Sequence, residues 1–293
     1  MKLFSKKHHL CYLHSMIMLS VLLITDLLLY PKNSYGNQEF FNNINEPNLI
    51  IGDENWIDLS NIYNSKKIQK NAQAVGYLKI YSKKRRCNAF LISRDIIMTN
   101  YHCIPDAETA KNTVFFPDFL QGTQRYDYLY TQPYLCEELL LSYKPLDITL
   151  LRCSGEPGAS HAIALLEKPT QAPQAGERIY IIHQNCNTLE YSDCAATKKF
   201  SPGIIVEPKY LALEEDRFNI FYNADTLQGS SGAPVFSAKT HKVIALHHKG
   251  HRGYENNATN CLNCGESNSG IPMGIIIDFL RYYYPSLYNE IYP

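Results

Sequence analysis

A short segment rich in glycine and serine carries the residue best suited to nucleophilic chemistry. It reads Gly229-Ser230-Ser231-Gly232-Ala233-Pro234. A serine that attacks a carbonyl carbon must lie on a tight turn whose backbone N–H groups face the developing oxyanion. Glycine at positions 229 and 232 lets the backbone adopt such a turn. We therefore predict Ser231 as a nucleophile and the N–H groups of Gly229 and Ser231 as its oxyanion hole. The alternative is an ordinary loop between strands.

A histidine beside a cysteine supplies a candidate general base. His102 precedes Cys103, and two apolar runs separated by a turn lead to it from Cys87. The two cysteines are 103 − 87 = 16 residues apart, which is enough for a hairpin whose ends meet. A disulfide between them would fix the turn that bears His102 and keep its imidazole within reach of Ser231. A purely structural histidine is the alternative.

An aspartate placed directly before an apolar run supplies a candidate orienting acid. Asp147 precedes residues 148–152 and lies between His102 and Ser231 in the chain. A carboxylate bonded to the Nδ1–H of a histidine fixes its tautomer and stabilises the imidazolium that forms during attack. A turn-forming aspartate is the alternative, since aspartate is common before strands.

Short apolar runs separated by turn residues must position these three side chains. The runs span residues 74–81, 89–93, 96–99, 148–152, 178–183, 218–222, 233–236 and 242–247. Runs of this length rich in Ile, Val, Leu, Tyr and Phe predict an all-β barrel or sandwich. Pro169, Pro173 and Gly176 suggest a linker between two halves. Apolar residues at helical spacing predict a C-terminal helix over about residues 275–284, ended by Pro285.

The overall composition limits the classes of partner. The 293 residues carry 28 basic and 28 acidic side chains, so the formal net charge is zero. This balance predicts no binding to nucleic acid and no stable association with a membrane. The 45% of hydrophobic residues suffices for a sizeable core.

Eight of the nine cysteines follow the N-terminal segment that contains Cys11. An even set in an exported chain predicts disulfides. A zinc site is the alternative for one pair, because Cys261 and Cys264 form a CxxC motif and His247 and His251 lie upstream. We expect no metal and no cofactor.

The N-terminus has the layout of a signal peptide. A basic start is followed by an apolar stretch from Leu10 to Tyr30 and by small residues at Ser34 and Gly36. We predict a signal peptide over residues 1–36, a linker or short pro-segment over 37–49, and a secreted or periplasmic protein. A retained membrane anchor is the alternative, but Asp26 within the apolar stretch would be costly in a bilayer.

These motifs together resemble the chymotrypsin-like serine proteases, and in particular their bacterial glutamyl endopeptidase branch. The order His102, Asp147, Ser231 and the segments "TNYHC", "DITLL" and "GSSGAPVF" match, as does Ile50-Ile51-Gly52-Asp53-Glu54. The resemblance spans about residues 50–284. It implies two six-stranded antiparallel β-barrels, over about 50–165 and 166–274, with the active site in the cleft between them.

The resemblance also implies a specificity pocket. Thr226 and His247 match positions that bind the substrate carboxylate in glutamyl enzymes, where a hydroxyl and an imidazole can donate to an anion. Asp225 matches instead the acid at the pocket base of trypsin-like enzymes, which would favour Arg or Lys before the scissile bond. The sequence leaves open whether cleavage follows Glu or follows Arg or Lys. Zinc bound to His247 would exclude a pocket for glutamate.

Several positions depart from the family pattern. Ser230 replaces the acid that pairs with a new N-terminus in animal digestive zymogens, Trp56 replaces an arginine, and His183-Gln184-Asn185 replaces a Gly-Tyr-Pro turn. His248 and His251 lie near the expected cleft and read most simply as part of a solvated loop.

The remaining cysteines are expected to pair as Cys136–Cys153, Cys186–Cys194 and Cys261–Cys264. The sequence thus predicts a monomeric serine endopeptidase that acts on proteins or peptides through an acyl-enzyme. The alternative is a catalytically silent binding module of the same fold.

Overall fold

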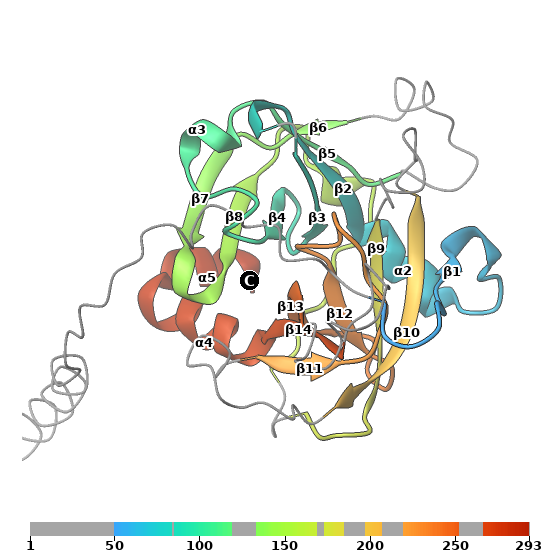
Figure 1. Cartoon of the computed structure of the whole chain (residues 1–293). Helices are drawn as coiled ribbons and strands as arrows, with labels where there is room; N and C mark the ends of the chain where they lie inside the picture. The colour runs from blue at the N-terminus through green and yellow to red at the C-terminus, as the bar shows by residue number, and fades with distance from the viewer. Residues whose placement is uncertain are drawn as a thin grey trace, which may run out of the picture. The chain divides into compact units, whose positions relative to one another are not determined.

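Strands dominate the part of the chain that the structure describes. The computed structural model describes residues 50–83, 85–118, 133–168, 173–184, 197–206, 219–251 and 266–292 (Figure 1). By its internal contacts the chain divides into residues 1–45 and residues 46–293. The strands described here all belong to the second unit, where they form two seven-stranded antiparallel sheets.

The first sheet is built from the residues that precede the Pro169 region. Its order is β6-β5-β2-β3-β4-β8-β7. The strands are β2 (Val75–Ile80), β3 (Arg85–Leu91), β4 (Ile96–Thr99), β5 (Thr113–Phe116), β6 (Tyr134–Leu135), β7 (Glu138–Tyr143) and β8 (Ile148–Arg152). The two end strands, β6 and β7, follow each other in the chain with only Cys136 and Glu137 between them. A disulfide from Cys136 to Cys153 joins that connection to the end of β8.

The second sheet closes on itself. Its order is β1-β10-β11-β14-β13-β12-β9, and β9 also pairs with β10, so six strands form a closed barrel. The strands are β1 (Ile57–Asp58), β9 (Arg178–Gln184), β10 (Lys198–Val206), β11 (Ile220–Tyr222), β12 (Pro234–Ser237), β13 (Val243–His251) and β14 (Ser267–Pro272). The predicted two-barrel fold with a C-terminal helix is confirmed, with β6 and β1 as additions to the six strands of each half.

The first strand in the chain pairs with a strand of the second barrel. Strand β1 lies within the range expected for the first barrel, residues 50–165, and pairs with β10. A two-residue strand has too few side chains to show a periodic pattern, so its partner cannot be inferred from the sequence.

The described residues also form four helices and four 3-10 turns. They are α2 (Lys66–Ala74), α3 (Ala107–Ala110), α4 (Met273–Tyr283) and α5 (Pro285–Ile291), with 3-10 turns η1 (Leu59–Asn61), η2 (Tyr81–Lys83), η4 (Lys144–Leu146) and η5 (Pro157–Ala159). The predicted C-terminal helix corresponds to α4. Pro285, read from the sequence as a stop, is the first residue of a further helix, a position that proline favours.

The C-terminal helices come after the second barrel but contact the first. Arg152 on β8 forms ion pairs with Asp95 and with Glu290 of α5, both at 2.6 Å. Phe279 of α4 stacks on Tyr143 of β7, with ring centroids 4.4 Å apart. Figure 1 shows α4 and α5 beside β7 and β8. These helices therefore join the two barrels.

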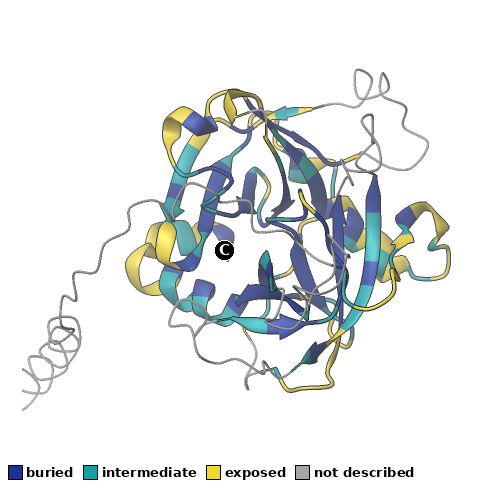
Figure 2. Cartoon of the chain, in the orientation of Figure 1, coloured by how far each residue is buried: buried dark blue, intermediate teal, exposed yellow. Residues whose placement is uncertain are grey.

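One buried cluster runs through both barrels. It includes Leu78 and Phe90 from the first and Tyr180, Phe236 and Leu246 from the second. Figure 2 shows buried residues along the strands and exposed residues on α3 and α5. The shared core fixes the two barrels against each other, so a site assembled from both has a defined geometry.

Several predictions lie outside the described residues. They are the signal peptide, the linker over 37–49, the Cys186–Cys194 pair, the Cys261–Cys264 pair and the alternative zinc site that needs those last two cysteines. Within the described ranges, no helix is both long enough and apolar enough to cross a membrane.

Candidate active site

The carboxylate of Asp147 binds both the ring and the backbone of His102. His102 Nδ1 lies 2.8 Å from Asp147 Oδ2, and the His102 N–H donates to Oδ1 at 2.9 Å. His102 lies in the turn after β4, and Asp147 follows η4 in a left-handed conformation with φ of 43°. Asn100 Nδ2 donates to the carbonyl of Asp147 at 3.0 Å and braces this conformation. The carboxylate thus orients the imidazole from two directions.

Two imidazoles keep Asp147 ionised. Burial raises the pKa of Asp147, but the charge of His102 and hydrogen bonds from His102 and His248 outweigh burial and lower it well below its ordinary value. His248 Nδ1 lies 3.4 Å from Asp147 Oδ2. The sequence placed His248 in a solvated loop, whereas the structure places it on β13 with only 11% of its side chain exposed. No local motif indicates this contact, because β13 and Asp147 come from different barrels.

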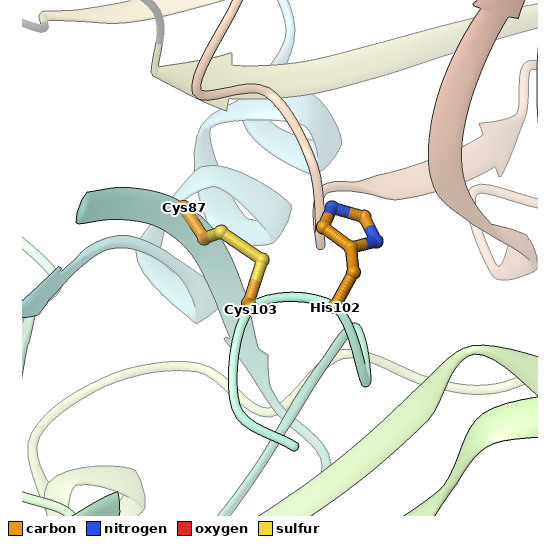
Figure 3. A group of neighbouring side chains, drawn as sticks. All are labelled: Cys87, His102 and Cys103. Carbon is orange, nitrogen blue, oxygen red and sulfur yellow. A yellow bond between two sulfur atoms is a disulfide. The ribbon is translucent and has the colours of Figure 1, made fainter. Parts of the chain in front are cut away.

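A disulfide fixes the turn that carries His102. Cys87 on β3 is bonded to Cys103, as the sequence predicts, and Figure 3 shows His102 projecting from the same turn. A cross-link of this span stabilises a fold by roughly 3 kcal/mol. Among the described residues, only Cys87, His102 and Cys103 bring three metal-ligand atoms together, but both sulfurs belong to the disulfide and offer no thiolate.

The turn that carries Ser231 lies between β3 and β13. The N–H of Asn88 on β3 donates to the carbonyl of Ser231 at 2.6 Å, and the N–H of Gly232 donates to the carbonyl of His247 at 3.0 Å. Gly232 has φ of 85°, and a Cβ there would lie 2.1 Å from the carbonyl oxygen of Asn88. Only glycine fits this position, as the sequence indicated.

The two residues that bond to this turn, Asn88 and His247, are chain neighbours of residues that hold or contact the His102–Asp147 pair. Asn88 follows Cys87, whose disulfide holds the residue after His102. His247 precedes His248, which contacts Asp147. The structure therefore brings Ser231, His102 and Asp147 to one region, where β3 of the first barrel meets β13 of the second.

Two backbone donors on the Ser231 turn are available to an anion. Gly229 has φ of 100°, which a side chain rarely tolerates. Neither the Gly229 N–H nor the Ser231 N–H donates a hydrogen bond to any residue that the structure describes. Paired backbone donors of this kind are what an oxyanion hole requires.

The two residues of the predicted glutamate pocket are buried beside the turn. Thr226 is fully buried, and its Oγ1 has no partner within the described residues. His247 Nδ1 lies 2.6 Å from the hydroxyl of Tyr222, which donates to the carbonyl of Ser269 at 2.9 Å. Burial, together with the charges of neighbouring histidines, lowers the pKa of His247 well below its ordinary value.

Asp225, the third pocket candidate, binds the backbone just before β1. Its two carboxylate oxygens accept the N–H groups of Ile51 and Asn55, each at 2.8 Å. Burial raises the pKa of Asp225, and the two N–H donors oppose that rise. Trp56, which follows Asn55 in the chain, contacts the ring of His183 edge-on, with ring centroids 6.3 Å apart. Asp225 therefore anchors residues 51–56 on the second barrel.

The sequence matches the family model of the trypsin-like peptidase domain over residues 87–246, more than half of the chain. The chain belongs to this family, and it is a protease. Curated protein sequences contain no match to it.

Solved structures show the same fold at low sequence identity. A Glu endopeptidase superimposes with a TM-score of 0.57 at 16% identity, covering 80% of this chain and 98% of that one. The Rv3671c protease of M. tuberculosis gives 0.51 at 14% identity, covering 74% and 92%. The HtrA-type protease AlgW gives 0.52 at 15% identity, covering 73% and 61%. At these identities the likeness concerns the fold alone.

Proposed function

We propose that this protease is a serine endopeptidase in which Ser231 is the nucleophile, His102 the general base and Asp147 the orienting acid. The observation that carries the proposal is the paired contact of the Asp147 carboxylate with the ring and backbone of His102, next to the glycine-bounded Ser231 turn. Such an arrangement suits a hydroxyl that must lose its proton as it attacks.

Each step moves a proton through His102. Ser231 Oγ attacks the peptide carbonyl carbon while His102 takes the hydroxyl proton, and the N–H groups of Gly229 and Ser231 bind the oxyanion. The C–N bond then breaks, the leaving amine takes the proton from His102, and an acyl-enzyme remains. Water, deprotonated by His102, attacks the ester, and the acid product leaves as the proton returns to Ser231. These steps require no metal and no organic cofactor.

Digestion of an unfolded protein tests this function. Purified protein incubated with reduced, alkylated casein should generate new internal N-termini, detected by mass spectrometry. A sulfonyl fluoride should abolish cleavage, whereas a metal chelator should leave its rate unchanged. Cleavage that survives the sulfonyl fluoride and stops with the chelator would contradict a serine mechanism. A folded protein that cleaves nothing would favour the silent binding module.

The pH profile should report the general base alone. A base must be neutral, so we expect kcat/KM to fall about tenfold per pH unit as the pH drops below roughly 6 to 7. Asp147 will not contribute to this fall, because its lowered pKa keeps it ionised throughout the range. His183, with a pKa lowered to about 3 mainly by burial, also stays neutral. A rate that stays flat to about pH 5 would argue against His102.

We propose that the enzyme cleaves after glutamate. A buried hydroxyl without a partner, as at Thr226, is costly unless a ligand supplies a hydrogen bond. A substrate carboxylate would accept from that hydroxyl and would raise the pKa of the neighbouring His247. Cleavage after Arg or Lys is the second candidate, but the carboxylate of Asp225 is already bonded to Ile51 and Asn55.

A peptide library with two variants distinguishes these specificities. The parent protein should cleave after Glu, and Thr226→Val should lower kcat/KM for Glu substrates about tenfold or more, since it removes one hydrogen bond to a charged group. Asp225→Asn should keep the Glu preference but lower the melting temperature, because it weakens the anchor of residues 51–56. Cleavage after Arg or Lys that disappears in Asp225→Asn would contradict this assignment.

We also propose that the protein is exported and monomeric. The predicted signal peptide over residues 1–36 motivates the first part, and the disulfides Cys87–Cys103 and Cys136–Cys153 are compatible with an oxidising compartment. Residues 37–49 would then begin the mature chain as a linker or short pro-segment, and the protease domain would follow from residue 50.

A further inference from the structure

Each residue of the Gly229–Ser231 turn is bonded to a partner outside the turn. Asn88 Nδ2 donates to the carbonyl of Gly229 at 2.6 Å, and the Asn88 N–H donates to the carbonyl of Ser231 at 2.6 Å. Between them, the hydroxyl of Ser230 lies 2.8 Å from His183 Nδ1. The turn is therefore fixed on one side by the first barrel and on the other by the second.

Asn88 is rigid because its side-chain amide pairs with the backbone of β9. Its Nδ2 also donates to the carbonyl of Gln184 at 2.8 Å, and its Oδ1 accepts the Gln184 N–H at 2.8 Å. The carbonyl of Asn88 accepts the hydroxyl of Thr99 at 2.7 Å, and the whole residue is buried. Since both amide N–H groups and the amide oxygen are used, the side chain has one satisfied orientation.

His183 links the turn to the wall of the second barrel. Its Nε2 lies 2.9 Å from the hydroxyl of Ser201 on β10, and the ring is fully buried. Burial and the charge of Lys199 keep the imidazole neutral, with a pKa of about 3. The hydroxyl of Ser230 also accepts the Leu227 N–H at 3.3 Å. That hydroxyl can then donate its hydrogen to Nδ1, which leaves Nε2–H to donate to Ser201.

We propose that Asn88 and His183 are positioning residues that hold the oxyanion-hole donors of Gly229 and Ser231 in place before substrate binds. The inference rests on the proposed function of this turn. Donors that need no rearrangement stabilise the transition state more than the bound substrate. Neither Asn88 nor His183 is a terminal residue, so their contacts with the turn do not require a free N-terminus. His183 would thus fix Ser230, at the position where animal digestive zymogens have an acid that pairs with a new N-terminus.

Removal of one hydroxyl tests the inference. Ser230→Ala breaks the bond to His183 and leaves Ser231, His102 and Asp147 unchanged. We expect kcat to fall by roughly 10- to 100-fold, less than the loss of a whole oxyanion donor, while KM changes less than about threefold. Binding of a peptide aldehyde, whose tetrahedral adduct places an oxygen in the hole, should weaken by a similar factor.

Tyr180→Phe is the matched control. It also removes a buried hydroxyl from the second barrel, one bonded to Asn71 and His241 away from the turn. It should lower thermal stability as Ser230→Ala does and keep kcat within about twofold. If the two variants lose stability alike and neither loses kcat, His183 and Ser230 are merely structural and the inference is wrong.

Substitutions of His183 give a second readout. Asn at position 183 can place an amide near the former Nδ1, so His183→Asn should retain more kcat than His183→Leu. Equal kcat in the two folded variants would contradict the inference. If His183→Leu does not fold, the comparison of Ser230→Ala with Tyr180→Phe still decides. A parent protein that hydrolyses nothing would overturn the proposed function itself, which separates the two failures.

Discussion

Ser231→Ala is expected to lower kcat by about 10⁵ to 10⁶, the scale observed when the nucleophile of a Ser-His-Asp triad is removed. The methyl group cannot attack the carbonyl carbon, and the rate that remains would come from binding and from the N–H donors of Gly229 and Ser231. KM should change little, because Ser231 contributes its bond only as the reaction proceeds. Steady-state hydrolysis of a fluorogenic Glu peptide measures both constants.

A folded variant is essential to that experiment. The Ser231 carbonyl, which accepts from Asn88, is a backbone group and survives the substitution. We therefore expect an unchanged near-ultraviolet circular dichroism spectrum. Ser93→Ala, which removes a hydroxyl from a turn of the first barrel, is the matched control and should keep the parent rate. Activity of folded Ser231→Ala within tenfold of the parent would exclude Ser231 as nucleophile.

Asp147→Asn is expected to lower kcat by about 10³ to 10⁴ at neutral pH. An amide can donate to His102 Nδ1, which would hold the imidazole in the tautomer that cannot accept the proton of Ser231. The loss should shrink at high pH, where hydroxide can replace the general base. The pH dependence of kcat/KM between about pH 6 and 10 measures this.

Asp95→Asn is the matched control for that change. Asp95 is a partly exposed carboxylate of the same barrel, paired with Arg152 at 2.6 Å. It precedes β4, whereas His102 follows that strand. It should lose a little stability and no kcat. A loss in Asp147→Asn no larger than that in Asp95→Asn would mean that Asp147 only stabilises the fold.

The parts of the fold that could be predicted are those with local patterns. The apolar run over residues 148–152 corresponds to β8, and the run over 178–183 to all but the last residue of β9. Periodicity does not reveal β1 or α5, because the first is two residues long and the second begins at a proline that also ends helices. Elements that depend on packing for their existence leave weak signals in sequence.

Some residues of the candidate site could likewise be predicted from local motifs, and others could not. Short motifs indicate His102, Ser231 and the Cys87–Cys103 bond, because their residue types are those that this chemistry requires. The contacts of His248 with Asp147 and of Asn88 with Gly229 join the two barrels, so no spacing along the chain could indicate them. His183 stood out as a departure from the family pattern, but its partner Ser230 is 47 residues away. Asp225 resembles a substrate-binding position of trypsin-like enzymes. Its contacts with the N–H groups of Ile51 and Asn55 lie 174 and 170 residues away along the chain, so no local motif indicates them.

Covalent labelling with a fluorophosphonate tests the central claim most directly. The reagent reacts with a serine only where a base deprotonates it and donors bind the phosphoryl oxygen. We predict a single adduct that peptide mapping places on Ser231, not on the adjacent Ser230. His102→Ala should slow labelling by several orders of magnitude. A folded protein that takes up no label, or takes it on another serine, would contradict the assignment of Ser231, His102 and Asp147 as a catalytic triad.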